Sequence, residues 1–596
     1  MKKFIKFTAL FLSLTIALTA CGGKNKSEDK KQEAKDSIST RGTIVENEGT
    51  PIKGGVLQVG LVSDSPFKGI FSVEFSNDSV DANITNPTMW GTFSTDSELK
   101  LKGNDAVDIE FDQEAKTATI KIKDSFKWSD GTPVTSRDFA FHYEIVADPE
   151  YKGVRYDADH KNIVGIEEFR NGEADTISGL ETPDDKTLVI TFKEFTPSIL
   201  WGSGIVTEPV PYEYLKDLKV SEMEASPQLR EKPLSTGPFV VKEIIPGQKV
   251  EFEKNEYYWR GAPKLDGVVF EVVPSSNVLS ALKSGKYDLV TSIPSTIKTE
   301  ELENLKNYSL LERDDNNLSY MGFKLGKWDE EKGEVIVDPN AKMANVNLRK
   351  AMAYALDQKA LGDKFYEGLR IPANSMLIPI FKDFRDENAE GYSYDPEKAK
   401  KLLDEAGYKD VDNDGFREDP NGEKLVIYYA TMSGSEVAEP MAMAYIQWWK
   451  EIGLNVELTN GRLLEFQLFY EMVENDDPNI DVFSGGWQIG NNPDQNETYS
   501  KYSAFNFSRY TDDAIQTALD NMASENAFDS EFRKQAYKDF DKAMFDAAST
   551  VPTMYRIAQY VVNDRIKYFD WSYPYGQENP FTWADIELTA DAPIKE

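Results

Sequence analysis

A short acidic turn carries the clearest metal-ligand spacing in the sequence. It reads Asp410-Val411-Asp412-Asn413-Asp414-Gly415, which matches the opening of an EF-hand calcium loop. The bidentate glutamate that closes such a loop belongs six positions beyond the glycine, where this chain has Asn421. A tight turn explains the same residues without a metal ion. We therefore expect a turn and no metal here, with calcium as the alternative.

Residues that act as catalytic nucleophiles or bases are scarce. The chain has one cysteine and two histidines, and it lacks a His-Glu-x-x-His motif and a nucleophile elbow. We expect His142 to pack or to lie at the surface of a helix over 135–147, and His160 to lie in a loop beside Asp157 and Asp159. Nothing singles out a catalytic pair among the 102 acidic residues. The sequence therefore gives no evidence for catalysis, and we expect neither an enzyme nor a cofactor.

The segment from Asp481 to Asp494 has residue types that suit close contact with another chain. An apolar strand leads into Gly485-Gly486, where the missing side chains let a second backbone approach. Trp487 follows and offers a large flat surface, although a buried position in a sheet is the alternative for it. This is the segment with the strongest indication of function.

The elements that must hold this segment are clearest between residues 235 and 290. Two alternating runs, Phe239–Ile245 and Lys249–Glu253, are joined through Pro246-Gly247 and predict a β-hairpin. A strand is expected over 268–273, and a helix from Val278 follows it. This order of strands and helices is typical of an α/β fold.

Further elements are expected on both sides of this stretch. Apolar residues at helical spacing, together with Asp or Asn at capping positions, predict the helices, and alternation predicts the strands. We expect strands over 118–123 and 454–458, and helices over 135–147, 345–356, 357–368, 395–406 and 438–452.

Four motifs in this order closely resemble one family. They are Lys127-Trp128-Ser129-Asp130-Gly131-Thr132-Pro133-Val134, Thr236-Gly237-Pro238, the Asn255-x-x-Tyr258-Trp259 pattern, and Ala281-Leu282-Lys283-Ser284-Gly285-x-Tyr287-Asp288. Together they resemble the peptide/nickel-binding family of extracellular solute-binding proteins, the receptors that feed ABC importers. The resemblance covers nearly all of the chain after its first residues.

The resemblance implies an α/β fold with two hinged lobes, like that of periplasmic binding proteins, and an additional third lobe. The chain is expected to cross between the large lobes near Val273 and again near Met554, so that the lobes close over a ligand. The expected limits are 54–75, 189–273 and 557–596 for lobe I, 76–188 for lobe II and 274–556 for lobe III.

The resemblance also assigns ligand-binding residues. In the family, the segment at 481–494 lines the cleft and pairs with the ligand peptide as an added strand. The position three beyond the tryptophan is commonly an aspartate that binds the peptide α-amino group, but here it is Gly490, so either Asp494 replaces it or the peptide terminus is not fixed. The expected ligand-binding residues are Tyr320, Met321, Gly322, Phe323, Gly485, Gly486, Trp487, Gln488, Asn491, Asp494 and Tyr555.

The first residues are typical of a bacterial lipoprotein signal. Three lysines precede an apolar run over 7–20, which is too short to span a bilayer. The run ends in Leu18-Thr19-Ala20-Cys21, and Cys21 is the single cysteine of the chain. We expect a signal peptide over 1–20, lipidation of Cys21, and a polar disordered tether over 21–53.

Charge excludes some partners and favours others. With 67 basic and 102 acidic side chains, the net charge of −35 argues against nucleic acid and against peripheral binding to anionic lipid. Together with the lipoprotein-like signal, the family resemblance implies a monomer, lipid-anchored on the extracellular face of the cell membrane, that captures oligopeptides for the permease subunits of an ABC importer. The alternatives are a receptor for a dipeptide, a nickel chelate or haem, a peptide-sensing receptor, and a secreted hydrolase. The scarcity of histidine weighs against the nickel and haem ligands.

Overall fold

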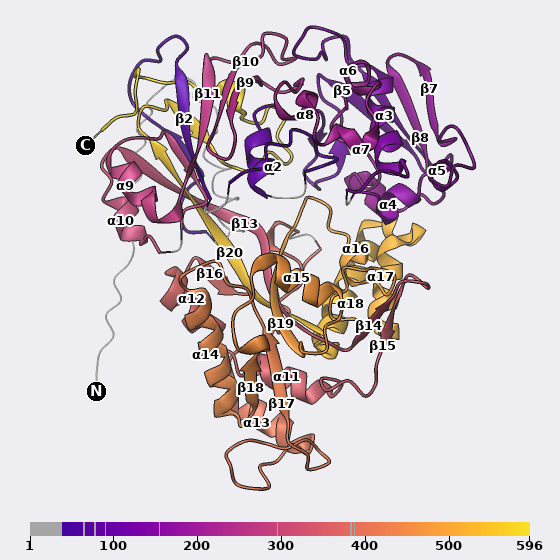
Figure 1. Cartoon of the computed structure of the whole chain (residues 1–596), viewed down its shortest axis with the longest axis vertical. Helices are drawn as coiled ribbons and strands as arrows, with labels where there is room; N and C mark the ends of the chain where they lie inside the picture. The colour runs from indigo at the N-terminus through magenta and orange to yellow at the C-terminus, as the bar shows by residue number, and fades with distance from the viewer. Residues whose placement is uncertain are drawn as a thin grey trace, which may run out of the picture.

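The computed structural model describes residues 39–63, 66–76, 79–89, 91–153, 155–294, 296–381, 384–386 and 388–595 (Figure 1). The expected signal peptide, Cys21 and the first part of the expected tether lie outside these residues. The end of that tether is packed against the body, because β1 (Ile44–Glu46) pairs with β21 (Tyr568–Asp570). Arg41 also forms an ion pair with Glu312. The expected tether over 21–53 therefore extends too far, because Arg41 and residues 44–46 already contact the body.

One mixed sheet of eleven strands runs through the molecule and forms its frame. Its strand order is β18-β17-β19-β13-β20-β12-β2-β11-β10-β9, with β16 paired to β20. The strands are β2 (Val56–Val62), β9 (Phe239–Ile245), β10 (Lys249–Lys254), β11 (Gly267–Val273), β12 (Leu289–Thr291), β13 (Tyr308–Phe323), β16 (Arg370–Pro372), β17 (Val426–Ala430), β18 (Asn455–Leu458), β19 (Val482–Gln488) and β20 (Thr550–Asn563). The predicted hairpin is confirmed as the antiparallel pair β9–β10.

Two long strands, β13 and β20, join the upper and lower parts of the molecule in Figure 1. They pair from Tyr308–Asn563 to Gly322–Thr550, and the register shifts between Asp314 and Leu318. The first crossing therefore lies in β13 and not near Val273, because β12, which follows Val273, still pairs with β2. The second crossing, β20, contains Met554. An interrupted two-strand connection is a natural place for hinge bending.

The upper right part of Figure 1 is built on a separate antiparallel sheet in the order β5-β6-β8-β7. The motif that begins at Lys127 forms a turn in which the Trp128 N–H donates to the Thr132 carbonyl. Thr135 and Asp138 then form a capping box at the start of α3, so this motif has the structural role expected of it. The elements here are β5 (Val107–Asp112), β6 (Thr117–Ile122), β7 (Leu180–Asp184), β8 (Thr187–Thr191), α3 (Ser136–Ala147), α4 (Ala158–Lys161) and α5 (Ile166–Arg170).

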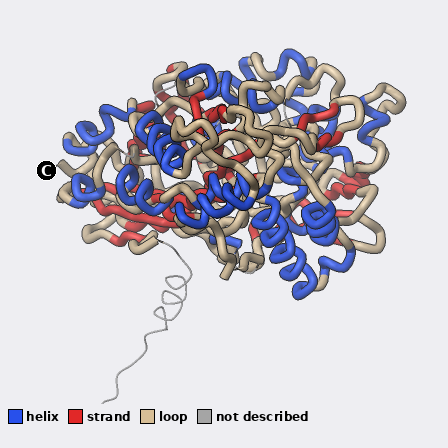
Figure 2. Tube along the Cα trace, turned by 90° about the horizontal axis from the view of Figure 1, so that it is seen from below, coloured by secondary structure: helices blue, strands red, loops and turns tan. Residues whose placement is uncertain are grey.

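Helices cover the lower part of the main sheet, and Figure 2 shows strands inside the body with helices on its outside. Asn345, Asp357 and Asp395 accept the hydrogen bonds of N-terminal caps, as their positions in the sequence predict. The helices of this part are α11 (Val346–Tyr354), α12 (Gln358–Tyr366), α13 (Pro396–Glu405), α14 (Ala438–Glu451), α15 (Phe466–Glu474), α16 (Asn496–Tyr499), α17 (Asp513–Ala523) and α18 (Ser530–Ala547).

The remaining elements are short. They are α2 (Ser79–Thr85), α6 (Tyr212–Leu215), α7 (Val220–Met223), α8 (Pro227–Arg230), α9 (Val278–Lys283), α10 (Thr299–Glu303), β3 (Ser94–Thr95), β4 (Leu101–Lys102), β14 (Gly326–Asp329) and β15 (Glu334–Val337). Among the described residues, none of the helices combines the length and the apolar character needed to cross a membrane.

Candidate ligand-binding cleft

Two cavities meet beside the strands that join the lobes. The larger has a volume of about 850 Å³ and is lined by residues of β13, β20, α12, the 291–294 turn and the C-terminal segment 569–586. The smaller, of about 410 Å³, lies between residues 91–105 and 574–580. Pro574 lines both cavities. Gln488 lines the larger and Asn491 the smaller, so the segment singled out in the sequence lies where they meet.

Strand β19 has one edge paired and one edge largely free. It pairs with β13 along its whole length, but with β17 only at Val482 and Phe483. The Ile489 N–H donates to the Asn316 carbonyl at 2.8 Å, so Ile489 faces β13. Backbone groups of successive strand residues face alternate edges, so those of Gly485 and Trp487 also face β13. The backbone groups of Gly486 and Gln488 then face the other edge, where no strand of the described part of the chain pairs with them. This edge can accept a further strand.

Trp487 is held by the protein's own aromatic rings. It stacks on Tyr320 with 5.7 Å between the ring centroids and on Phe507 with 5.5 Å, and Phe505 meets it edge-on. The indole is therefore packed against these rings and only partly exposed, which differs from the expectation of an open flat surface. Gly485 allows this packing, because a Cβ there would lie 2.8 Å from the Tyr320 hydroxyl. Gly486 has room for a Cβ, which would meet its nearest neighbour, the Leu318 carbonyl oxygen, at an ordinary contact distance of 3.6 Å.

The expected ligand-binding residues on β13 lie in the core. The side chains of Tyr320, Met321 and Phe323 are 3%, 0% and 0% exposed, and the Phe483 ring fills the space above Gly322. They hold β13 against its neighbours rather than facing a cleft, which differs from the expectation. Alternation along a strand cannot show this burial, because both faces of β13 are covered.

Tyr555 is also buried, and it organises a neighbouring loop. Its hydroxyl lies 2.9 Å from the Ser375 carbonyl and accepts a hydrogen bond from the Ser375 N–H at 3.1 Å. Burial raises the pKa of Tyr555 to about 12, so the hydroxyl stays protonated. Tyr555 therefore positions the 374–377 segment beside the hinge.

The loop after β19 reaches the adjoining lobe. The Asn491 amide donates to the Leu99 carbonyl at 3.4 Å, and the Asn492 amide donates to the Ser203 hydroxyl at 2.9 Å. Asp494 accepts hydrogen bonds from the backbone and side chain of Asn496, and burial raises the pKa of its carboxyl. Gly490 is exposed, with no atom within 4 Å of a Cβ built on it. Asp494 is therefore engaged locally, and Gly490 supplies no charge.

The larger cavity contains arginines that sequence reasoning did not select. Arg556 forms an ion pair with Asp315 at 3.0 Å, and Arg313 lies over the Trp571 ring at 4.3 Å. Arg370 lies over the Tyr366 ring, and no carboxylate of the described residues forms an ion pair with it. Burial and the nearby charge of Arg556 lower the pKa of Arg370 to about 9, which leaves it charged at neutral pH. No local pattern marks these residues, because they converge from separate elements.

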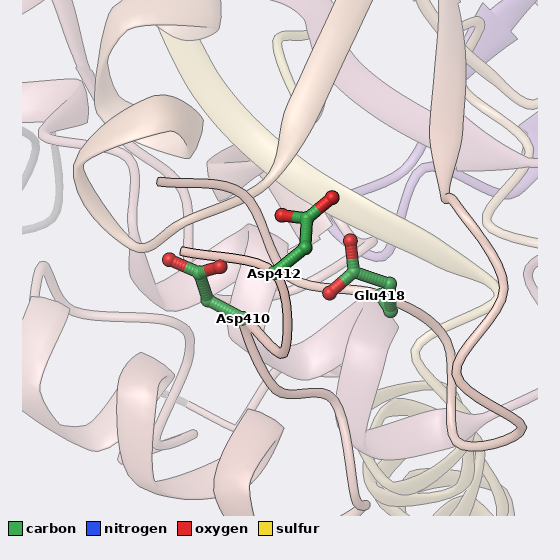
Figure 3. A group of neighbouring side chains, drawn as sticks. All are labelled: Asp410, Asp412 and Glu418. Carbon is green, nitrogen blue, oxygen red and sulfur yellow. The ribbon is translucent and has the colours of Figure 1, made fainter. Parts of the chain in front are cut away.

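The acidic turn forms the backbone hydrogen bonds of a tight turn. The Asp410 carboxylate accepts from the Gly415 N–H at 3.0 Å, and that of Asp412 accepts from the Asp414 N–H at 3.1 Å. Figure 3 shows that Glu418 approaches them from the returning chain, and its carboxylate accepts from the Val411 N–H. Glu418 belongs to this acidic group although it lies outside the motif read in the sequence. These hydrogen bonds explain the turn as sequence analysis expected.

Comparison with known proteins identifies relatives of this chain. Residues 100–509 match the profile described as bacterial extracellular solute-binding proteins, family 5 middle. The oligopeptide-binding protein OppA of Lactococcus lactis subsp. lactis is 34% identical over 602 residues, which cover 98% of each chain. The oligopeptide-binding protein AppA of Bacillus subtilis (strain 168) is 27% identical over 501 residues, 84% of this chain and 83% of that one.

A solved structure is also similar. Lactococcal OppA, complexed with an endogenous peptide in the closed conformation, gives a TM-score of 0.80 at 34% identity. The match covers 89% of this chain and 100% of that one. The expected multi-lobed α/β fold is thereby confirmed.

Proposed function

Because the chain belongs to family 5 of the bacterial extracellular solute-binding proteins, we propose that it captures oligopeptides and delivers them to the permease of an ABC importer. The family consists of solute-binding proteins, so the chain is a binding protein and not an enzyme. Similarity over 98% of the chain to proteins named for oligopeptide binding supports peptides as the ligand class.

The observation that carries the proposal is the free edge of β19 at the junction of the two cavities. An extended peptide that pairs with Gly486 and Gln488 would add a strand to the main sheet, and its side chains would project toward the cavities. Main-chain hydrogen bonds do not depend on the peptide sequence. Such a site therefore suits a receptor with broad specificity and side-chain pockets that hold water.

The charges of the cleft suit a peptide with carboxylates. The Arg370 guanidinium lies in the wall of the larger cavity and has no ion-pair partner among the described residues. An arginine side chain binds a carboxylate through two parallel hydrogen bonds, so a peptide C-terminus or an acidic side chain fits this position. The cleft thus offers recognition of main chain and of negative charge.

The N-terminus of the peptide is expected to contribute little. Gly490 carries no carboxylate, and the Asp494 carboxylate is engaged by Asn496. We expect N-acetylation of one long peptide to weaken its binding by less than about tenfold, or ~1.4 kcal/mol. Calorimetric titration of the free and acetylated forms measures this ratio. A loss of a hundredfold or more would contradict it and indicate that Asp494 or another acid binds the α-ammonium group.

The ligand class is tested with the purified protein. Native mass spectrometry is expected to show bound peptides of mixed sequence. The masses of these ligands would then be spread over many values and would not equal that of haem or of one nickel chelate. Retention of haem, a nickel chelate or dipeptides alone would replace the proposal with that receptor class. Steady cleavage of the peptide pool by homogeneous protein would instead establish a hydrolase.

We also propose that the chain is a monomer held at the outer face of the cell membrane by lipid on Cys21, which the sequence around that residue supports. Multiple acyl chains anchor a protein that has no other affinity for anionic lipid. Replacing Cys21 by alanine is expected to move the protein from the membrane fraction to the medium, or to leave it unprocessed. Fractionation with immunoblotting reads this out. Unchanged membrane retention would argue against the anchor.

A further inference from the structure

Two apolar side chains of the upper right part are buried in the core of the lower part. Leu99 lies between β3 and β4, and Trp201 is the last residue of the 3-10 helix η1 (Pro197–Trp201). Their exposed fractions are 6% and 4%, and both belong to an apolar core that includes residues of α17, α18 and β20. The two parts are therefore held by side-chain packing as well as by the strands that join them.

Trp201 is oriented by its own part and packed by the other. Its indole N–H donates to the Glu98 carbonyl at 2.9 Å. Its ring meets the Phe384 ring edge-on, with 5.9 Å between the centroids, and the Arg533 guanidinium of α18 lies 5.2 Å from the ring centroid. Arg533 also forms an ion pair with the Glu98 carboxylate at 3.6 Å. These contacts join η1 and the 98–99 turn to α18.

This contact is separate from the ligand-binding cleft. Neither Leu99 nor Trp201 lines the two cavities described above. A peptide held in those cavities therefore adds nothing to the packing of these two side chains. The cleft and the contact are connected through Asn491, which lines the smaller cavity and donates to the Leu99 carbonyl.

Two costs oppose the packing. The Leu99 backbone has a φ of 66°, in the left-handed region that leucine rarely adopts, and such a conformation persists only where the surroundings enforce it. The side chain of Arg533 is 3% exposed, and its Nε atom has no hydrogen-bond partner among the described residues. Separation of the two parts would release the Leu99 backbone and return Arg533 to water. Burial of apolar surface therefore favours the contact, whereas strain and desolvation favour its release.

We propose that Leu99 and Trp201 form a clasp that holds the two parts together without a ligand and releases them reversibly when β13 and β20 bend. The ligand-free chain then already populates the closed form, and a ligand shifts an existing equilibrium. The apparent affinity of a ligand that needs the closed form depends on the fraction of chains that are closed. The clasp therefore controls affinity from outside the cleft, and this last step rests on the proposed function.

Small-angle X-ray scattering of the native sequence gives the first test. The purified protein is washed free of bound ligand, and no peptide is added. The ligand-free protein is expected to scatter as the closed structure does. A curve that fits only a form with the two parts separated would overturn the proposal, and this result does not depend on how a variant folds.

A variant of the clasp gives the second test. Trp201→Ala is expected to raise the ratio of open to closed chains by about tenfold or more, because less apolar surface is buried on closing. Trp201→Phe keeps an apolar ring and is expected to stay mostly closed. Scattering measures both variants, and circular dichroism checks that they fold. A folded Trp201→Ala protein that is as closed as the native protein would show that Trp201 does not hold the two parts.

Trp448→Ala is the matched control. Trp448 lies on α14 and contacts Tyr394 and Tyr445, so its packing is confined to the lower part. Its removal is expected to leave the ratio of open to closed chains unchanged. An equal opening in Trp448→Ala and Trp201→Ala would assign the effect to general loosening of the fold and reject the clasp.

Peptide affinity gives a separate readout. Calorimetry is expected to show weaker peptide binding in Trp201→Ala, in proportion to its smaller closed fraction. Unchanged affinity in a variant that scattering shows to be open would contradict control of affinity by the clasp. The scattering measurements contain no peptide, so failure of the proposed function leaves their result unaffected.

Discussion

Replacing Arg565 by methionine is expected to lower the free energy of unfolding by about 3–5 kcal/mol, since it leaves a buried charge without its partner. The Arg565 guanidinium pairs with the Asp288 carboxylate, and the two side chains are 1% and 0% exposed. Asp288 also accepts from the Gln58 N–H at 2.7 Å, and Arg565 donates to the Val56 carbonyl at 2.9 Å. The pair therefore ties the end of β20 to β2 in the frame of the upper part.

A surface pair provides the control. Lys359 and Asp363 are 2.6 Å apart on α12 but are 73% and 56% exposed, so Lys359→Met is expected to leave the free energy of unfolding nearly unchanged. Urea unfolding followed by tryptophan fluorescence compares both variants with the native sequence. If the free energy of unfolding of Arg565→Met lies within about 1 kcal/mol of that of the native sequence, the buried ion pair does not have the expected stabilising role.

Replacing Gly486 by proline is expected to weaken peptide binding by about tenfold or more, at least ~1.4 kcal/mol. Proline removes the backbone N–H that faces the free edge of β19, and its ring occupies the position of the added strand. The hydrogen bonds of β19 to β13 come from its other residues and remain. A receptor that pairs with the main chain of its ligand loses affinity for every peptide in the same way.

Gly486→Ala is the matched control. It keeps the N–H, and its Cβ meets no atom closer than 3.6 Å, so affinity is expected to change by less than about threefold, or ~0.65 kcal/mol. Calorimetry with one long peptide measures both variants, and circular dichroism checks that they fold. Equal affinities for the proline and alanine variants would show that the ligand does not pair with this edge.

Local sequence signals predicted several of the regular elements, with ends that lie within about two residues of those observed. Asn345, Asp357 and Asp395 begin helices because a side chain that accepts from the backbone two or three residues ahead stabilises a helix start. The hairpin at Pro246-Gly247 forms as predicted because the turn and the alternation on both sides agree. Motif order also identified the family and the α/β fold, which the comparisons confirm. These features depend on residues near one another in the chain.

Tertiary structure alone decided where the chain crosses and which side chains are free. The chain first crosses between the upper and lower parts in β13. It does not cross earlier, because β12 still pairs with β2 and β20, which are distant in the sequence. Trp487 stacks on Tyr320 and Phe507, and the two histidines meet through α3 and α4. Spacing in one segment does not reveal such contacts, since each depends on how separate elements pack. The sequence by itself therefore determined several elements and the family, and packing between distant segments determined the cleft, its charges and the histidine pair.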